Sequence, residues 1–268
     1  MKRENGIGIG ILHYGLSSTL KHLLNSIPKS HLDKVIVLDH NESPFLNEEP
    51  VKLFHDESNP GFARGMNWLI RRALKENLDC FIGLTNDLVL REGSITNLFS
   101  GLQETDATVV QGTLISESDR ILTARHRLNR FFHWSHNLDR HRDLREIQDR
   151  KHWDTDFVCG AFFAVNLVKF RNRPVFFDED FYLYHEDIEW SLRLKQNGHK
   201  ISVLSHALAS HGESQATGGG LTKEGMRLRW PSLKTYLRKT RRSFLYRFMS
   251  VAAFWMRMLL VWRKDGCR

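Results

Sequence analysis

Acidic side chains gather at three places in this 268-residue chain. Asp39 and Asp87 each come after an apolar run, Val35–Leu38 and Cys80–Leu84, at points where a β-strand would end. The third group lies in Phe177–Glu189, where six acids are interleaved with aromatic residues. Aromatic neighbours hold carboxylates against partly buried surface, where a specific ionisation state can be maintained. These three groups are therefore the candidate sites of chemistry.

Each group also has a purely structural interpretation. An aspartate after a strand often only forms a turn or caps a helix. The acidic segment could be a solvated loop in which Glu189 pairs with Arg193, four residues further along a helix. The interleaved aromatic residues argue against a solvated loop. His211 also follows a predicted strand, but fourteen histidines make any single one unremarkable.

Strands and helices alternate in the first half of the chain. Apolar runs predict strands over Ile7–Leu12, Val35–Leu38, Val51–Phe54, Cys80–Leu84 and Ala107–Gln111, and helical patterns cover Thr19–Ser26, Gly61–Asn77 and a stretch from Ser94. Such alternation is typical of an α/β protein with a mostly parallel sheet flanked by helices. Ligands of such sheets bind beyond the carboxyl ends of the strands, which is where Asp39 and Asp87 fall.

The second half is organised differently. Ser116–Asp154 is rich in Arg, His and Asp and has weak periodicity, so we expect an extended excursion that could lie over the active site. Order returns with a strand predicted over Phe157–Val165, a helix over Ile188–Asn197 and a short strand over Lys200–Leu204.

Four motifs resemble, in the same order, those of family-2 glycosyltransferases with the GT-A fold. Residues 59–67 (NPGFARGMN) are similar to N-x-G-F-A-x-G-x-N, and residues 84–87 (LTND) resemble the L-N-x-D form of the DxD motif in the rhamnosyltransferase-like branch. Gly160-Ala161 followed by residues 177–193 resembles G-a … F-D-E-x-F-F-x-Y-x-E-D-x-D-x-x-x-R, and residues 39–43 resemble D-N-x-S. The resemblance spans roughly residues 7–215 and implies a GT-A fold, an α/β fold that binds nucleoside-diphosphate sugars.

The resemblance implies a role for each matching residue. Asp87 and His211 would hold a divalent metal, Mg²⁺ or Mn²⁺, at the donor diphosphate. Asp187 would be the general base, with Glu186 as its catalytic neighbour. The residues expected to bind the nucleotide sugar are Tyr14, Asp39, Gly61, Arg64, Asn67 and Asn86. Thr85 stands where the motif usually has Asn or Asp. This leaves a single acid in the motif and predicts a modest metal affinity.

The chemistry agrees with these roles. A divalent cation neutralises charge on a departing diphosphate, and a carboxylate activates a sugar hydroxyl by taking its proton. One base and a single displacement predict inversion at the anomeric carbon. We therefore expect a metal-dependent inverting glycosyltransferase that moves rhamnose or another hexose. The expected acceptor is a saccharide or lipid-linked saccharide of bacterial surface polysaccharide synthesis.

Two other functions stay open. A sugar nucleotidyltransferase would need a glycine-rich phosphate loop with a lysine after the first strand, and Ile11–Gly15 offers none. A catalytically inactive module that binds sugar nucleotides would fit the presence of Thr85. The retention of Asp87, Glu186 and Asp187 argues against that module.

The composition excludes several classes of protein. Hydrophobic residues make up 41% and charged residues 26%, which excludes a disordered, collagen-like or multi-span membrane chain. Cys80, Cys159 and Cys267 include no CxxC pair, so we expect no disulfide framework. We expect Cys80 and Cys159 to be buried small side chains of a protein in a reducing compartment. Ile7–Leu12 is too short for a signal peptide and predicts the first strand.

The net charge of +8 comes from the C-terminal tail. Residues 223–268 carry 13 basic and 2 acidic residues, whereas the remainder carries 26 basic and 29 acidic ones. Because the body has no basic surplus, we expect no nucleic-acid partner. We predict a GT-A catalytic domain over residues 1–221 and a basic amphipathic helical extension over residues 222–268.

The tail also predicts where the protein works. Treated as one helix, it places basic side chains opposite a face rich in aromatic residues, as in helices that lie in an anionic membrane surface. This favours a cytoplasmic protein, peripheral on the cytoplasmic face of the inner membrane. The alternative is that one or two helices pack on the catalytic domain or on another subunit. Val251–Trp262, interrupted by Arg257, is too short to predict a membrane span.

Overall fold

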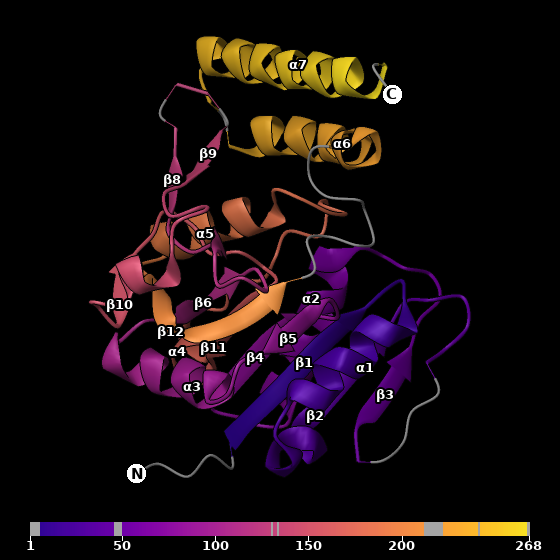
Figure 1. The fold of residues 1–268 in the computed structure, drawn as a ribbon, viewed down its shortest axis with the longest axis vertical. Coiled ribbons are helices and arrows are strands. Elements are labelled where there is room, and N and C mark those ends of the chain that lie inside the picture. Colours follow the sequence, from indigo (N-terminus) through magenta and orange to yellow (C-terminus); the bar gives the residue numbers. More distant parts are fainter. Residues whose placement is uncertain are drawn as a thin grey trace.

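The computed structural model describes residues 6–45, 50–129, 131–132, 134–211, 222–240 and 242–266. Within them the chain forms a ten-stranded mixed sheet with helices on both faces, a separate two-stranded sheet, and two helices at the C-terminal end (Figure 1). This is the α/β fold with a helical extension that the sequence predicts. The expected boundary after residue 221 adjoins residues 212–221, which lie outside the described part.

Parallel strands form one half of the sheet. Their order is β3 (Lys52–His55), β2 (Val35–Asp39), β1 (Ile7–His13) and β4 (Cys80–Thr85). β1 is paired on both sides, and the register brings the carboxyl ends of β1, β2 and β4 to the same edge. This edge is therefore available for ligands, as expected from the alternating pattern.

The other half of the sheet mixes parallel and antiparallel pairs. β11 (Phe162–Asn166) runs antiparallel to both β4 and β6 (Val109–Ile115). β12 (Ile201–His211) pairs in parallel with β6 and antiparallel with β10 (His152–Asp154) and β5 (Leu88–Leu90). Parallel pairing therefore holds among β3, β2, β1 and β4 and between β6 and β12, while β11 makes the sheet mixed.

The strand predicted over residues 157–165 starts later, at Phe162. Side chains satisfy the preceding backbone: Gln111 Oε1 accepts from Cys159 N at 2.6 Å, and Ser191 Oγ accepts from Val158 N at 3.1 Å. A backbone amide bonded to a side chain cannot join a ladder, so this segment is a loop although its residues are apolar.

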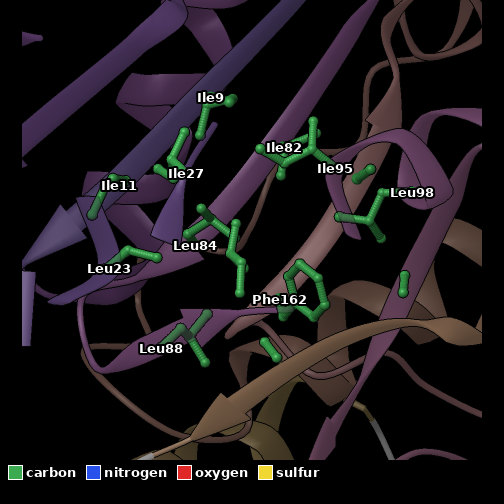
Figure 2. Packing of buried hydrophobic residues seen from close by; sticks show 14 of the residues in the cluster. Ile9, Ile11, Leu23, Ile27, Ile82, Leu84, Leu88, Ile95, Leu98 and Phe162 are labelled. Atoms are coloured by element: carbon green, nitrogen blue, oxygen red, sulfur yellow. The ribbon is translucent and has the colours of Figure 1, made fainter. Parts of the chain in front are cut away.

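Helices cover both faces of the sheet. α1 (Ser17–Ser26) and α3 (Ser94–Glu104) contribute to one buried cluster, while α2 (Phe62–Lys75), α4 (Leu167–Asn172) and α5 (Glu186–Gln196) contribute to another. Figure 2 shows the first cluster, in which side chains of β1 and β4 meet those of α1 and α3; it includes Ile9, Ile11, Ile82, Leu84, Leu23, Ile95, Leu98 and Phe162. Two 3₁₀ helices are η2 (Lys29–Lys34) and η3 (Leu144–Ile147).

The excursion over residues 116–154 is an ordered unit. β7 (Ile121–Thr123) extends the main sheet beside β6, and β8 (His126–Leu128) pairs with β9 (Ser135–Asn137) as a separate hairpin. Asp139 is fully buried, and Arg125 donates to its carboxylate from Nε and Nη2 at 2.8 and 2.5 Å. A buried bidentate pair of this kind fixes the path of the excursion beside the sheet.

The C-terminal extension consists of two helices, α6 (Lys223–Lys239) and α7 (Phe244–Gly266). α6 lies between the α/β body and α7 (Figure 1). One buried cluster joins all three parts; it includes Phe157, Phe181 and Ile188 of the body, Met226, Leu233 and Leu237 of α6, and Tyr246, Phe254 and Val261 of α7.

Two predictions for the tail are corrected. A single helical wheel through the tail is wrong, because the helix ends at Lys239 and a new one begins at Phe244. The prediction that no stretch is long enough to span a membrane is also wrong, because one helix has the length and the composition that a membrane span requires. Phe244–Trp262 has a mean hydropathy of 1.4, and 28% of its span is buried in the protein.

Candidate active site

Side chains of three neighbouring strand ends meet at the carboxyl edge of the sheet. Asn86, which follows β4, donates from Nδ2 to Thr19 Oγ1 at 2.7 Å and to the Tyr14 carbonyl at 3.3 Å. Asn41, which follows β2, accepts from Gly15 N at 2.8 Å. The ring of Tyr14 is half-exposed. The structure therefore brings the predicted donor residues Tyr14 and Asn86 together on accessible surface.

Asp39 lies at the same edge but has a different environment. Its side chain is fully buried, and it accepts from Asn41 N at 3.0 Å, Asn41 Nδ2 at 2.8 Å and Phe45 N at 2.6 Å. All three donors belong to the loop after β2. The carboxylate thus holds this loop beside the donor edge, and its predicted contact with the nucleotide stays a prediction.

The residues predicted at the start of α2 connect this helix to the acidic segment. Gly61 has φ of 91°, and a Cβ there would lie 2.5 Å from the Tyr182 carbonyl oxygen, so only glycine fits. Asn67 is fully buried; it donates to Phe177 O and Glu179 Oε1 and accepts from Phe177 N, each at 2.9 Å. Asn67 therefore positions the acidic segment, and its predicted contact with the sugar nucleotide stays a prediction.

Arg64 lies on the exposed side of α2. Its guanidinium Nε is 3.8 Å from Glu179 Oε2, and both side chains face solvent. An exposed pair of this length contributes little to stability. Arg64 is thus free to turn toward a ligand, and its predicted contact with the nucleotide sugar remains a prediction.

Asp87 and His211 form the pair expected to hold a metal. β5 and β12 pair in a register that places His211 opposite Leu88, and His211 Nε2 lies 3.2 Å from Asp87 Oδ2. Thr85 Oγ1 donates to Asp87 Oδ1 at 2.8 Å. Burial alone would raise the pKa of Asp87, but the hydrogen bond and charge of His211 and the Thr85 hydroxyl outweigh it and lower that pKa. The carboxylate is thus held ionised, as a metal ligand must be.

The donor set fits a cation that is shared with a substrate. No group of three or more His, Cys, Asp or Glu ligands occurs in the described ranges. One carboxylate and one imidazole suit Mg²⁺ or Mn²⁺ when phosphate oxygens and water complete the coordination shell. Thr85, which interrupts the motif, orients Asp87 through its hydroxyl and so supports the site.

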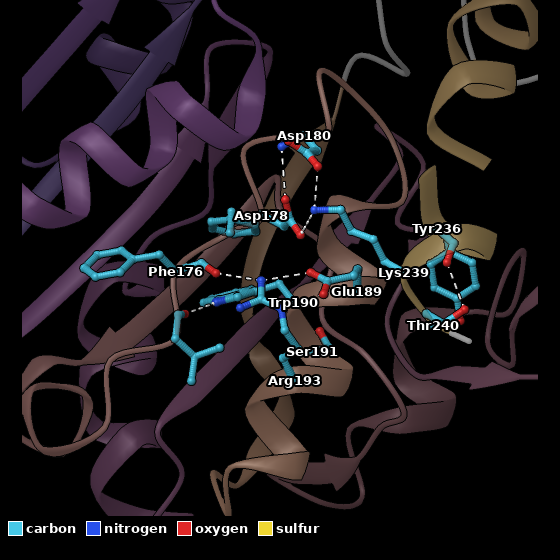
Figure 3. A network of polar contacts seen from close by, with 12 residues as sticks. Phe176, Asp178, Asp180, Glu189, Trp190, Ser191, Arg193, Tyr236, Lys239 and Thr240 are labelled. Atoms are coloured by element: carbon cyan, nitrogen blue, oxygen red, sulfur yellow. Dashed lines mark hydrogen bonds and ion pairs between the residues drawn. The ribbon is translucent and has the colours of Figure 1, made fainter. Parts of the chain in front are cut away.

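Ion pairs account for four of the six acids in the Phe177–Glu189 segment. The partners are Arg71 for Glu179, Lys239 for Asp178 and Asp180, and Arg193 for Glu189. Figure 3 shows that Lys239 reaches Asp178 and Asp180 from α6. The predicted Glu189–Arg193 pair is confirmed, with Nε and Nη2 donating at 2.5 and 2.8 Å.

Glu186 and Asp187 differ from these four acids. Within the described ranges neither forms an ion pair, and Glu186 Oε2 is buried without a hydrogen-bond partner. They occupy the first turn of α5, where Ile188 N donates to Asp187 Oδ1 at 2.8 Å. Burial raises the pKa of both carboxyls, and the charge of Asp187 raises that of Glu186 further. Two adjacent acids with raised proton affinity suit proton transfer near neutral pH.

The thiol of Cys159 lies near both Asp87 and the adjacent acids Glu186 and Asp187. Burial raises its pKa to about 12, and the charges of Asp187, Glu186 and Asp87 raise it as well. All three carboxylates therefore lie within electrostatic range of one side chain. Cys159 itself stays protonated and is not a nucleophile.

A cavity of about 920 Å³ opens beside Glu186 and Asp187. His211 lines the same cavity, so it reaches the predicted metal pair. Its other walls come from the excursion, including Trp134, and from the extension, including Arg229 of α6 and Arg257 of α7. The sequence does not reveal these last three residues as part of the site, because none belongs to a motif or a strand end.

A sequence profile described as glycosyl transferase family 2 matches residues 16–173. No curated protein was found to match the chain. Solved structures are similar: GalNAc-T7 with UDP, GalNAc and Mn²⁺ is 16% identical with a TM-score of 0.62, over 84% of this chain and 47% of that one. The mannosyltransferase PcManGT from Pyrobaculum calidifontis, with GDP-Man and Mn²⁺, is 11% identical with a TM-score of 0.57, over 89% and 65%.

S. aureus TarS is 14% identical with a TM-score of 0.51, over 86% of this chain and 39% of that one. The chain thus spans less than two thirds of the length of each of these structures. At such low identity the likeness concerns the fold. It confirms the GT-A architecture that the motifs imply.

Proposed function

The chain belongs to glycosyl transferase family 2, and we propose that it transfers a sugar from a nucleoside-diphosphate donor to a hydroxyl group of an acceptor. One observation carries this proposal. The two acids of the Phe177–Glu189 segment that form no ion pair in the described chain line a large cavity together with His211, the partner of Asp87. A candidate proton acceptor and a candidate metal ligand therefore face the same space.

The donor would lie across the carboxyl edge of the sheet. Tyr14 and Asn86 would contact the nucleotide, while Asp39 holds the neighbouring loop in place. Asp87 and His211 would hold Mg²⁺ or Mn²⁺, which when bound neutralises charge on the diphosphate. Thr85 keeps the Asp87 carboxylate oriented for that role.

Asp187 would act as the general base from within the cavity. Glu186 is the more deeply buried of the two acids, so it is the one that keeps its proton and leaves Asp187 ionised. Asp187 would take the proton of the acceptor hydroxyl as its oxygen attacks the anomeric carbon. A single attack opposite the leaving diphosphate gives inversion. We propose a hexose, with rhamnose as the first candidate because of the LTND motif.

A screen of nucleotide sugars by thermal unfolding tests this function. The matching donor should raise the Tm with Mn²⁺ present, and EDTA should abolish the rise, because only the folded site binds the complex. A nucleoside triphosphate with a sugar 1-phosphate serves as the control for a nucleotidyltransferase. If that mixture alone raises the Tm, the transferase proposal is wrong. Binding without any sugar transfer would leave the inactive sugar-nucleotide module.

The outer face of α7 suggests where the acceptor is met. Apolar side chains along this helix are exposed; they are Phe244, Leu245, Phe248, Met249, Trp255, Met256, Leu259, Leu260 and Trp262. The opposite face packs on α6. We propose that α7 lies flat in an anionic membrane surface, because its exposed apolar face belongs to a strongly basic tail, residues 223–268. We therefore propose a cytoplasmic enzyme at the surface of the inner membrane, where it would meet lipid-linked saccharide precursors of surface polysaccharide.

Flotation with phosphatidylglycerol vesicles at low salt tests the membrane proposal. The wild-type protein should float, and a variant with Phe248→Asp and Leu259→Asp should remain at the bottom. Both side chains are about 60% exposed, so the changes remove apolar contact with lipid without disturbing the core. Val168→Asp, at an exposed apolar position of α4, is the matched control and should float. Wild-type protein that does not float would overturn the proposal.

A further inference from the structure

Two arginines from the C-terminal helices line the cavity that contains Asp187. The guanidinium carbon of Arg229 lies 4.0 Å from the centre of the Tyr184 ring, and its Nε is buried without a hydrogen-bond partner. The guanidinium carbon of Arg257 lies 3.1 Å from the centre of the Trp134 ring. Aromatic rings thus hold both guanidinium groups in the wall of the cavity.

Neither arginine forms an ion pair with an acid in the described chain. Burial, with a contribution from the charge of Arg229, lowers the pKa of Arg257 to about 10. An arginine with that pKa is still charged at neutral pH. Two like charges in a partly enclosed cavity repel each other, and an anion between them would relieve the repulsion. Of the acids that line the cavity, Glu186 and Asp187 lie within electrostatic range of Arg229, whose charge lowers the pKa of both.

The position of the pair indicates the acceptor rather than the donor. Tyr14, Asp39 and Asn86, at the donor edge, do not line this cavity, whereas Asp187 and His211 do. The cavity therefore contains the proposed base and a predicted metal ligand but none of these three donor-edge residues. Ser250, Phe254 and Arg257 of α7 also line it. The apolar outer side of the same helix is exposed.

We propose that Arg229 and Arg257 bind a phosphoryl group of the acceptor, which is therefore a phosphorylated saccharide. A tetrahedral phosphoryl group has enough oxygens to accept hydrogen bonds from two guanidinium groups on different helices. The hydroxyl group to be glycosylated would then lie at Asp187, in the same cavity. This inference rests on the proposed function, because it assigns the acceptor to that reaction. The phosphoryl group can come from a lipid phosphate or from a soluble sugar phosphate.

Calorimetry with geranyl phosphate, without nucleotide or metal, tests the pair directly. The variant with Arg229→Gln and Arg257→Gln should bind this compound at least about tenfold more weakly than wild type, because charged hydrogen bonds are lost. Geraniol, which lacks the phosphoryl group, should bind at least about tenfold more weakly to wild type. Arg247→Gln, at an exposed arginine of α7, is the matched control and should not change binding. Equal binding of geranyl phosphate by the double variant and wild type would overturn the proposal.

Three further readouts distinguish phosphoryl binding by the pair from a structural role and from donor binding. The Tm of the empty double variant should equal or exceed that of wild type; a fall would assign the pair a structural role and overturn the proposal. Glucose 1-phosphate distinguishes the two sources of the phosphoryl group. If its binding also depends on Arg229 and Arg257, the protein recognises the phosphoryl group alone. If geranyl phosphate binds and glucose 1-phosphate does not, the ligand is a lipid phosphate. Loss of Mn²⁺-dependent donor binding in the double variant would place the pair in the donor site and overturn the proposal. If wild type binds no nucleotide sugar, the proposed function fails, while the phosphate result still reports on the pair.

Discussion

Replacing Asp187 by asparagine is expected to lower the rate of sugar transfer at least ~100-fold at saturating donor, since general-base assistance typically contributes ~10²–10⁴-fold. The amide keeps the size of the side chain, and its oxygen can still accept from Ile188 N. It cannot take a proton from the acceptor. Donor binding should therefore stay near the wild-type value, so that the loss appears in kcat.

Two neighbouring acids provide the controls for Asp187. Glu189→Gln changes another acid of the same helix turn that pairs with Arg193 and does not line the cavity, so it should keep its transfer rate. Glu186→Gln should lose less than Asp187→Asn. Because burial raises the pKa of Asp187, the wild-type rate should rise with pH above the range of an exposed aspartate, and Asp187→Asn should lack this step. Near-wild-type turnover in Asp187→Asn would move the role of base to Glu186.

Replacing Asp87 by alanine is expected to abolish Mn²⁺-dependent binding of the donor. The protein supplies two ligands to the proposed metal, and this change removes the charged one. Calorimetry with the matching nucleotide sugar, in Mn²⁺ and in EDTA, measures the effect. The fold should persist, because Asp87 lies at the end of β4 and outside the apolar clusters.

Asp119→Ala is the matched control for Asp87→Ala. Asp119 is an exposed aspartate that pairs with Arg91 on the surface, so its removal should leave both binding and stability nearly unchanged. Mn²⁺-dependent binding that survives in Asp87→Ala would remove Asp87 from the metal site. Loss of binding together with loss of the folded state would be detected by circular dichroism of the same samples.

The strand ends and the acids behind them were predictable, because apolar periodicity locates strands and parallel topology gathers their carboxyl ends. β4 and β2 end within one residue of the predicted positions, so Asp87 and Asp39 were located correctly. The burial of Asp39 was not predictable. Its three hydrogen-bond donors lie in the loop after β2, where no sequence pattern fixes the path of the backbone.

The walls of the cavity could not be predicted for a related reason. Trp134, Arg229 and Arg257 come from segments without motifs, and only tertiary packing places them opposite Asp187. The tail also shows how a periodicity argument fails. One helical wheel assumes a single helix, but α6 ends at Lys239 and α7 begins at Phe244, so the two helices orient their apolar faces independently.

The hydrogen bonds of Asn67 have a consequence for the design of chimaeras. They join α2 to residues 110 and 112 positions later, and both oxygen and nitrogen of the amide are used. The acidic segment is therefore not a transplantable cassette. An acidic segment taken from a relative and grafted into this protein needs a backbone that accepts a hydrogen bond from Asn67 and donates one to it. Otherwise it has to be transferred together with its own α2. Exchange between relatives is best made with both pieces at once.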